Sequence, residues 1–151
     1  MALIRRWLMI VLIAGLAGTL VELLLLRHTD GFWQLAPVVL LAAGMVVAGW
    51  SALAPRAVSV RLLQGVMSLL VLSGAVGMIQ HFRGNLGYER DSNPSLSGAE
   101  LYRSALQGST PALAPGAMIQ LGLIGLLLAF RHPGLARTGR GEDPSETRNE
   151  T

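Results

Sequence analysis

Residues 7–26 read WLMIVLIAGLAGTLVELLLL, an apolar run in which Thr19 and Glu22 are the polar residues. An α-helix rises about 1.5 Å per residue, so roughly 20 such residues cross the hydrocarbon core of a bilayer. Two arginines precede the run. A cleaved signal peptide also begins with basic residues before an apolar stretch, so this alternative has to be considered. The run continues to Leu26, well past a weak cleavage site at 15–17, and we therefore expect a retained membrane anchor.

Three more apolar runs follow, and the whole chain has the composition of a membrane protein. Of its 151 residues, 52% are hydrophobic and 14% are charged, and the mean hydropathy is +0.51. Short connections at 27–34 and 54–61 favour antiparallel neighbours. We predict an all-α integral membrane protein, an antiparallel bundle of four transmembrane helices in one domain over residues 1–134. The predicted spans are residues 7–26, 35–53, 62–80 and about 112–130, the last beginning at Ala112 or Gly116.

The distribution of arginines predicts the orientation of this bundle. An excess of basic residues marks cytoplasmic loops, and Trp is enriched at both membrane interfaces. With both termini in the cytoplasm, eight arginines lie inside and four lie outside, at Arg27, Arg83, Arg90 and Arg103. We expect a multi-pass protein of the cell membrane, in a bacterium the inner membrane. Trp7 and Trp50 then mark the inner boundary and Trp33 the outer one.

Composition also excludes several kinds of chemistry. The chain has no cysteine, which removes thiolate nucleophiles and Cys-based zinc or iron–sulfur sites. All twelve cationic residues are arginine, so a Walker lysine and a Schiff-base lysine are both missing. The pI of about 10.6 reflects arginines at helix ends rather than a basic face for nucleic acid. We expect no enzyme activity, no cofactor and no nucleic-acid partner.

Small residues spaced by four predict which helix faces pack. Transmembrane helices associate through such residues because lipid supplies no hydrophobic drive for packing. Each predicted span carries one pair, which favours a compact bundle and leaves a homo-oligomer open. The pairs are Ala14 and Gly18, Gly44 and Ala48, Ser73 and Gly77, and Gly125 and Ala129.

Helical spacing places several polar side chains on these same faces, in the outer half of the membrane. Glu22 is the single acidic residue within a span, where a charge costs on the order of 2.5–3.5 kcal/mol at the helix centre. It either marks a functional site or snorkels to the interface close by. The glutamines are typical of interhelical hydrogen bonding. The expected cluster consists of Glu22, Gln34, Gln80, His81 and Gln120.

Residues 82–111 form the one long external loop, and its last part carries a helix signal. Ser97 and Glu100 have the spacing of a capping box, which predicts a short amphipathic helix that ends near Gln107. The first part reads either as a solvated connector or as a lid that docks a partner. The candidate contacts on this side are His28, Asp30, Asn85, Tyr88 and Glu89.

Two further features complete the sequence interpretation. His28 and His81, with Glu22 or Asp30, have the chemistry of metal ligands, but their spacing matches no ligand motif, so we expect no metal. Residues 135–151 are polar and lack periodicity, which predicts a disordered cytoplasmic tail.

Two hypotheses for function follow from this layout. The first is a small non-catalytic accessory or interaction subunit in the lipid bilayer, whose outer loop and bundle face contact a larger membrane protein or a second copy of the chain. The alternative is a transporter or receptor for a small solute, a proton or a cation, which uses the polar cluster around Glu22.

Overall fold

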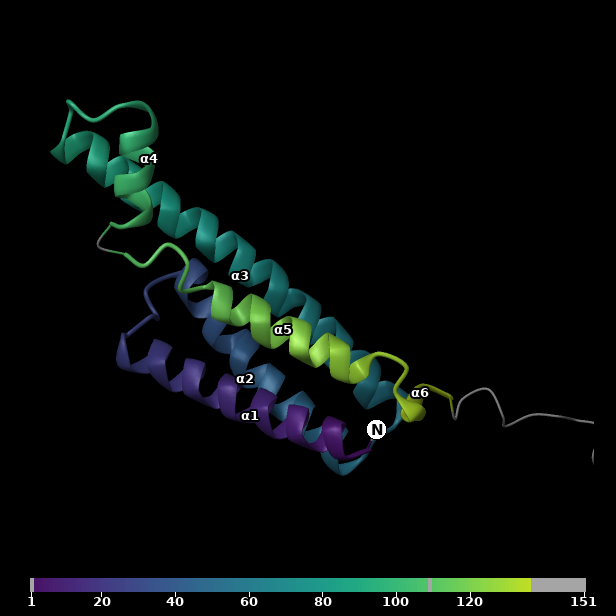
Figure 1. Ribbon diagram of the computed structural model, residues 1–151. Helices are drawn as coiled ribbons and strands as arrows, with labels where there is room; N and C mark the ends of the chain where they lie inside the picture. The colour runs from purple at the N-terminus through teal and green to yellow at the C-terminus, as the bar shows by residue number, and fades with distance from the viewer. Residues whose placement is uncertain (1, 109, 137–151) are drawn as a thin grey trace, which may run out of the picture.

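The computed structural model describes residues 2–108 and 110–136, and every regular element among them is a helix (Figure 1). The all-α prediction is therefore confirmed for this part of the chain. Three of the helices are long and apolar enough to cross a membrane, and α5, with 14 residues, is shorter. The helices are α1 (Ala2–Leu25), α2 (Phe32–Leu53), α3 (Ala57–Ser92), α4 (Gly98–Leu106), α5 (Gly116–Ala129) and α6 (Pro133–Ala136).

Local hydrogen bonds fix the tight turn between α2 and α3. The Arg56 backbone N–H donates to Ser59 Oγ over 3.1 Å, and the Ser59 hydroxyl donates to the carbonyl of Ala54 over 2.8 Å. Ser59 is fully buried, and these bonds satisfy its hydroxyl. A serine at the start of the helix thus reverses the chain within three residues, as expected for an antiparallel pair.

α3 is much longer than expected, and this corrects the predicted boundary of the outer loop. The helix was expected to end at Gln80, but it continues without a break to Ser92. Proline ends or kinks a helix because it lacks a backbone N–H, and no proline follows Gln80 until Pro94. Tertiary packing supplies most helix stability in proteins, and here α4 packs against the added turns. Residues 82–92 are therefore helix and not a solvated connector.

α4 confirms the predicted short helix, but its predicted capping box does not form. Ser97 is the N-cap residue, yet its side chain makes no capping hydrogen bond. Leu101 and Ala105 are buried, whereas Leu106 is exposed. The helix is held by these two apolar residues against α3 rather than by its cap.

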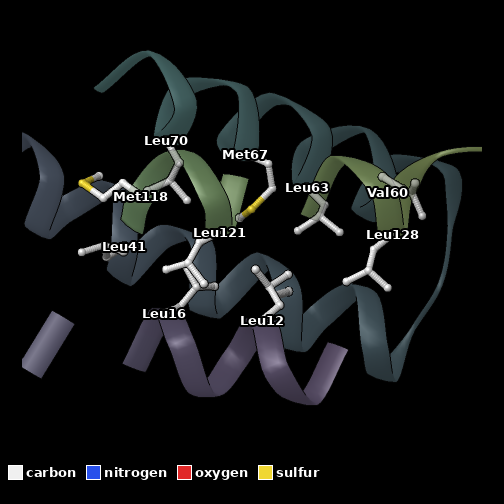
Figure 2. Packing of buried hydrophobic residues seen from close by; sticks show 12 residues of the cluster. Leu12, Leu16, Leu41, Val60, Leu63, Met67, Leu70, Met118, Leu121 and Leu128 are labelled. Carbon is white, nitrogen blue, oxygen red and sulfur yellow. The ribbon is translucent and has the colours of Figure 1, made fainter. Parts of the chain in front are cut away.

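The core of the bundle is apolar and is formed by α1, α2, the first half of α3 and α5 (Figure 2). α3 and α5 are the most extensively packed pair, and their backbones come very close. A Cβ atom on Gly122 would lie 2.7 Å from the carbonyl oxygen of Met67, and one on Gly74 would lie 2.8 Å from that of Pro115. No larger residue fits at either position without moving a backbone. Figure 2 labels core residues from all four helices, among them Leu12, Leu16, Leu41, Met67, Leu70 and Leu121.

The predicted small-residue faces are correct for α2 and α5 and wrong for α1. Ala48 and Ala129 are fully buried, and Gly44 and Gly125 are buried as well. On α1 both Ala14 and Gly18 are exposed, and nothing lies within 4 Å of a Cβ placed on Gly18. Leu12 and Leu16, spaced by four on another side of the helix, set its packed face because they bury more apolar area.

The two ends of the described chain meet at one end of the bundle (Figure 1). The Arg5 guanidinium donates to the carbonyls of Leu128, Phe130 and Arg131, at 3.3, 3.1 and 3.2 Å. These oxygens belong to the last turn of α5 and the residues after it, which lack helical partners. The arginine therefore caps α5 and joins it to α1.

The structure also revises the start of the predicted tail. Pro133 and Gly134 do not end all helical structure, since α6 follows α5 after a short break. Leu135 packs against the core cluster and is not part of a disordered tail. The rest of the predicted tail, residues 137–151, lies outside the described residues.

Candidate functional site

The predicted polar cluster is not assembled within the bundle. Glu22, Gln80 and Gln120 are exposed, so the prediction that they face protein is wrong in this single chain. Gln34 is half-buried, and its Oε1 accepts the backbone N–H of Asp30 over 3.0 Å, which closes the first turn of α2. His81 is half-buried as well, and its Nδ1 lies 3.0 Å from the carbonyl oxygen of Pro111. Gln34 and His81, the two partly buried residues of the predicted cluster, thus each have a separate hydrogen-bond partner and do not bond to each other.

Two of the predicted residues, His28 and His81, interact electrostatically. Burial lowers the pKa of His28 below its usual value, and the charge of His81 lowers it further. Asp30 and Glu22 are exposed. Within residues 2–108 and 110–136, no group of three or more His, Cys, Asp or Glu side chains could hold a metal ion.

Asn85 is the one predicted site residue that the structure buries, and it holds the α3–α4 hairpin together. Its Nδ2 donates to the carbonyl of Ala105 over 2.9 Å and to that of Thr110 over 2.6 Å. Its Oδ1 accepts the backbone N–H of Thr110 over 3.3 Å. A Cβ on Gly108 would lie 2.7 Å from Asn85 Cγ, so glycine is needed for this close approach. The amide side chain therefore ties both α4 and the returning segment to α3.

The remaining two candidates lie farther along α3. Tyr88 is 61% exposed on the surface of the hairpin. Glu89 is half-buried, and its Oε2 accepts a hydrogen bond from Asn93 Nδ2 over 3.1 Å. Asn93 also donates its backbone N–H to the Glu89 carbonyl, which ends the helix. Glu89 is thus engaged locally, whereas Tyr88 is available to a partner.

Sequence reasoning missed an open apolar groove at the base of the hairpin. It has a volume of about 480 Å³ and is lined from α3, from α4 and from the segment that returns to α5. The rings of Phe82 and Tyr102 stack in its wall, with centroids 6.2 Å apart and planes at 11°. The spacing of apolar residues on α4 was the available signal, but the partner helix was unknown from sequence. The lining includes Met78, Ile79, Phe82, Tyr102, Leu106 and Leu113.

Two arginines lie within one helical turn of residues that line this groove. Arg83 is one turn beyond Ile79 on α3, and Arg103 is one turn before Leu106 on α4. Both are exposed, and neither makes a hydrogen bond or an ion pair with another described residue. Each helix that lines the apolar groove thus carries an unengaged cationic residue one turn from a lining residue.

The interior of the described bundle offers little polar chemistry. The buried polar residues among the described ones are Ser51, Ser59 and Asn85. Ser59 caps α3, and Asn85 lies in the hairpin rather than in the bundle. A line of polar groups through the bundle core is absent from the part of the chain described.

Comparison with known protein families, with curated proteins and with solved structures found no match for this chain.

Proposed function

We propose that the chain is a small, non-catalytic multi-pass membrane protein that presents the α3–α4 hairpin to a larger membrane-protein partner. Its apolar composition and its three long apolar helices support membrane insertion. α5 would supply a fourth pass: its 14 residues are about 21 Å long, and the turns at 112–115 lengthen the crossing. The arginine distribution favours cytoplasmic termini and an external hairpin, in a bacterial inner membrane.

The observation that carries the proposal is the hairpin itself. Figure 1 shows the end of α3 and the whole of α4 extending beyond the turn between α1 and α2. The buried hydrogen bonds of Asn85 give this extension a defined shape. A projecting element that is ordered and carries an exposed tyrosine is typical of a recognition surface, since Tyr is enriched in interfaces.

The transport alternative gains no support from the interior of the bundle. Its core is apolar, and Glu22, the intended ion-coupled group, is exposed on α1. A pathway through one copy would need polar groups facing inward. Transport would therefore require a pathway between copies.

Site-specific photocrosslinking in native membranes tests the proposal. A photoreactive amino acid at Tyr88 should give a discrete, heavier protein adduct, because this side chain is exposed on the hairpin. The matched control is the same amino acid at Leu69, which is also exposed but lies on the bundle part of α3. An adduct of twice the chain mass indicates a homo-oligomer. No adduct at Tyr88, together with purification as a lone monomer, contradicts the proposal.

A further inference from the structure

We propose that the groove between α3 and α4 binds one phospholipid of the surrounding leaflet. One of its acyl chains lies along the apolar lining, and its phosphate binds Arg83 and Arg103. This inference rests on the membrane insertion proposed above and adds a defined ligand to the base of the hairpin.

The shape and lining of the groove fit an acyl chain. The groove is open at the surface, and the residues that line it are apolar. An apolar hollow of this kind is unfavourable in water, and an acyl chain that fills it removes the apolar surface from water. The Phe82 and Tyr102 rings form a flat wall, and tyrosine is suited to the headgroup level because one end of its ring is polar.

One face of α3 shows where the hydrocarbon region would end. Leu72, Val76 and Ile79 are exposed and follow the helical spacing of four and three residues, so they form one outward stripe. Arg83 is the next residue on the same stripe, four positions after Ile79. The stripe passes from apolar to cationic at the level of the groove, as a phospholipid passes from acyl chain to phosphate.

The two arginines have the chemistry for a phosphate group. A guanidinium presents its N–H donors as a fork that matches phosphate oxygens. Glu100 is one turn from Arg103 on α4 but forms no ion pair with it. Both guanidinium groups are therefore free to bind an anionic headgroup, one from α3 and one from α4.

Native mass spectrometry of the full chain, released from detergent with added phosphatidylglycerol, tests this inference. We expect one phospholipid retained by the wild type, and occupancy lower by about tenfold or more in an Arg83→Gln, Arg103→Gln double variant, because hydrogen bonds to charged groups are among the stronger ones. Arg90→Gln is the matched control, since Arg90 is an exposed arginine farther out on α3. Equal retention in the double variant and the wild type overturns the inference.

A second measurement identifies the occupant directly. A photoreactive amino acid at Leu106, in the groove wall, should form an adduct with the mass of a phospholipid in native membranes. An adduct of protein mass at this position would overturn the lipid assignment. Soluble glycerol 3-phosphate should not displace the lipid, and full displacement would show that the site binds the phosphate alone.

Alkaline carbonate extraction separates the two proposals. A protein that stays in the membrane pellet yet retains no lipid refutes the groove site and leaves the proposed function standing. A protein that is released to the supernatant refutes membrane insertion, and the lipid site with it.

Discussion

The bundle and the α3–α4 hairpin are held together in different ways. The bundle is stabilised by packed apolar side chains and by close approach of its backbones. Gly74 and Gly122 allow α3 to contact α5 and the residue before it directly. In the hairpin, two small apolar contacts at Leu101 and Ala105 are joined by the hydrogen bonds of Asn85. The bundle distributes its stability over many apolar contacts, whereas the hairpin combines a few apolar contacts with the hydrogen bonds of one buried side chain.

The proposed membrane insertion would account for this contrast. Helices within lipid gain no hydrophobic energy from association, so a bundle inserted there would depend on dense packing. A short hairpin outside the hydrocarbon would bury few apolar groups, and a fully satisfied buried amide would fix its geometry instead. A single substitution in the bundle should therefore destabilise the whole bundle, whereas one in the hairpin should loosen the hairpin alone.

The largest expected effect is in the bundle, for Gly122→Leu. A side chain there would collide with the backbone of α3 at Met67, so α3 and α5 must separate. Overpacking typically lowers the free energy of unfolding by about 1–3 kcal/mol, and a collision with the backbone lies at the upper end of this range. Thermal unfolding in detergent measures the loss. Gly65→Leu is the control, since nothing lies within 4 Å of a Cβ at Gly65. An equal loss of stability in this control would mean that the close approach at Gly122 is not the cause.

The next effect is confined to the hairpin, for Asn85→Leu. The substitution removes the side-chain amide that bonds the carbonyl of Ala105 and the carbonyl and N–H of Thr110. A buried polar group left without a hydrogen bond costs roughly 1–3 kcal/mol. We expect hydrogen exchange in α4 to rise while exchange in the bundle stays unchanged. Asn93→Leu, which removes an exposed hydrogen bond, should leave α4 protected. Simultaneous loosening of the bundle would contradict the separation of the two regions.

Arg5→Ala should weaken the junction of α1 and α5 by about 1 kcal/mol, because its three hydrogen bonds are exposed or only partly buried and each contributes little. Unfolding of the purified protein reports the change. Arg6→Ala is the matched control, since Arg6 is exposed and engages no described residue. If both variants lose the same stability, the carbonyl contacts of Arg5 are not the cause.

The smallest effect concerns the pH dependence of the turn between α1 and α2. The pKa of His28 is lowered in the folded protein, first by burial and then by the charge of His81. Folding therefore favours the neutral imidazole of His28. The contribution of His28 to stability is fully present above its pKa in the unfolded chain, about 6.5, and is lost as the pH falls through its lower pKa in the folded protein. NMR titration should show that His81→Gln raises the pKa of His28 only in part. A full return to the unfolded value would mean that burial is not the larger cause.

The sequence predicted the helices well where the signal was the length of an apolar run. Such a run depends on composition alone, and α1, α2 and the first part of α3 lie close to their predicted positions. Residues 82–92 were misjudged because glycines and mixed charges resemble a loop. The packing of α4 against this segment outweighs that local preference, and such a contact is not visible in the sequence.

The candidate site was predicted less well, because helix faces were assigned from one pair of small residues on each helix. On α1 that pair is exposed, so Glu22, which shares its face, turned out exposed too. Asn85 was named as a candidate, but its role depends on the carbonyls of Ala105 and Thr110, which come from elsewhere in the fold. The groove needs both α3 and α4 and could not be found from either alone.

The contact of Arg5 with the end of α5 joins residues 123 to 126 positions apart, so it has a consequence for biosynthesis. During synthesis α1 is made before α5, so Arg5 obtains these carbonyl partners only after the end of α5 has been made. A nascent chain that ends before Leu128 leaves Arg5 without these partners and α1 without its contact with α5, although α2 already packs against α1. The bundle is therefore complete only once α5 has been synthesised.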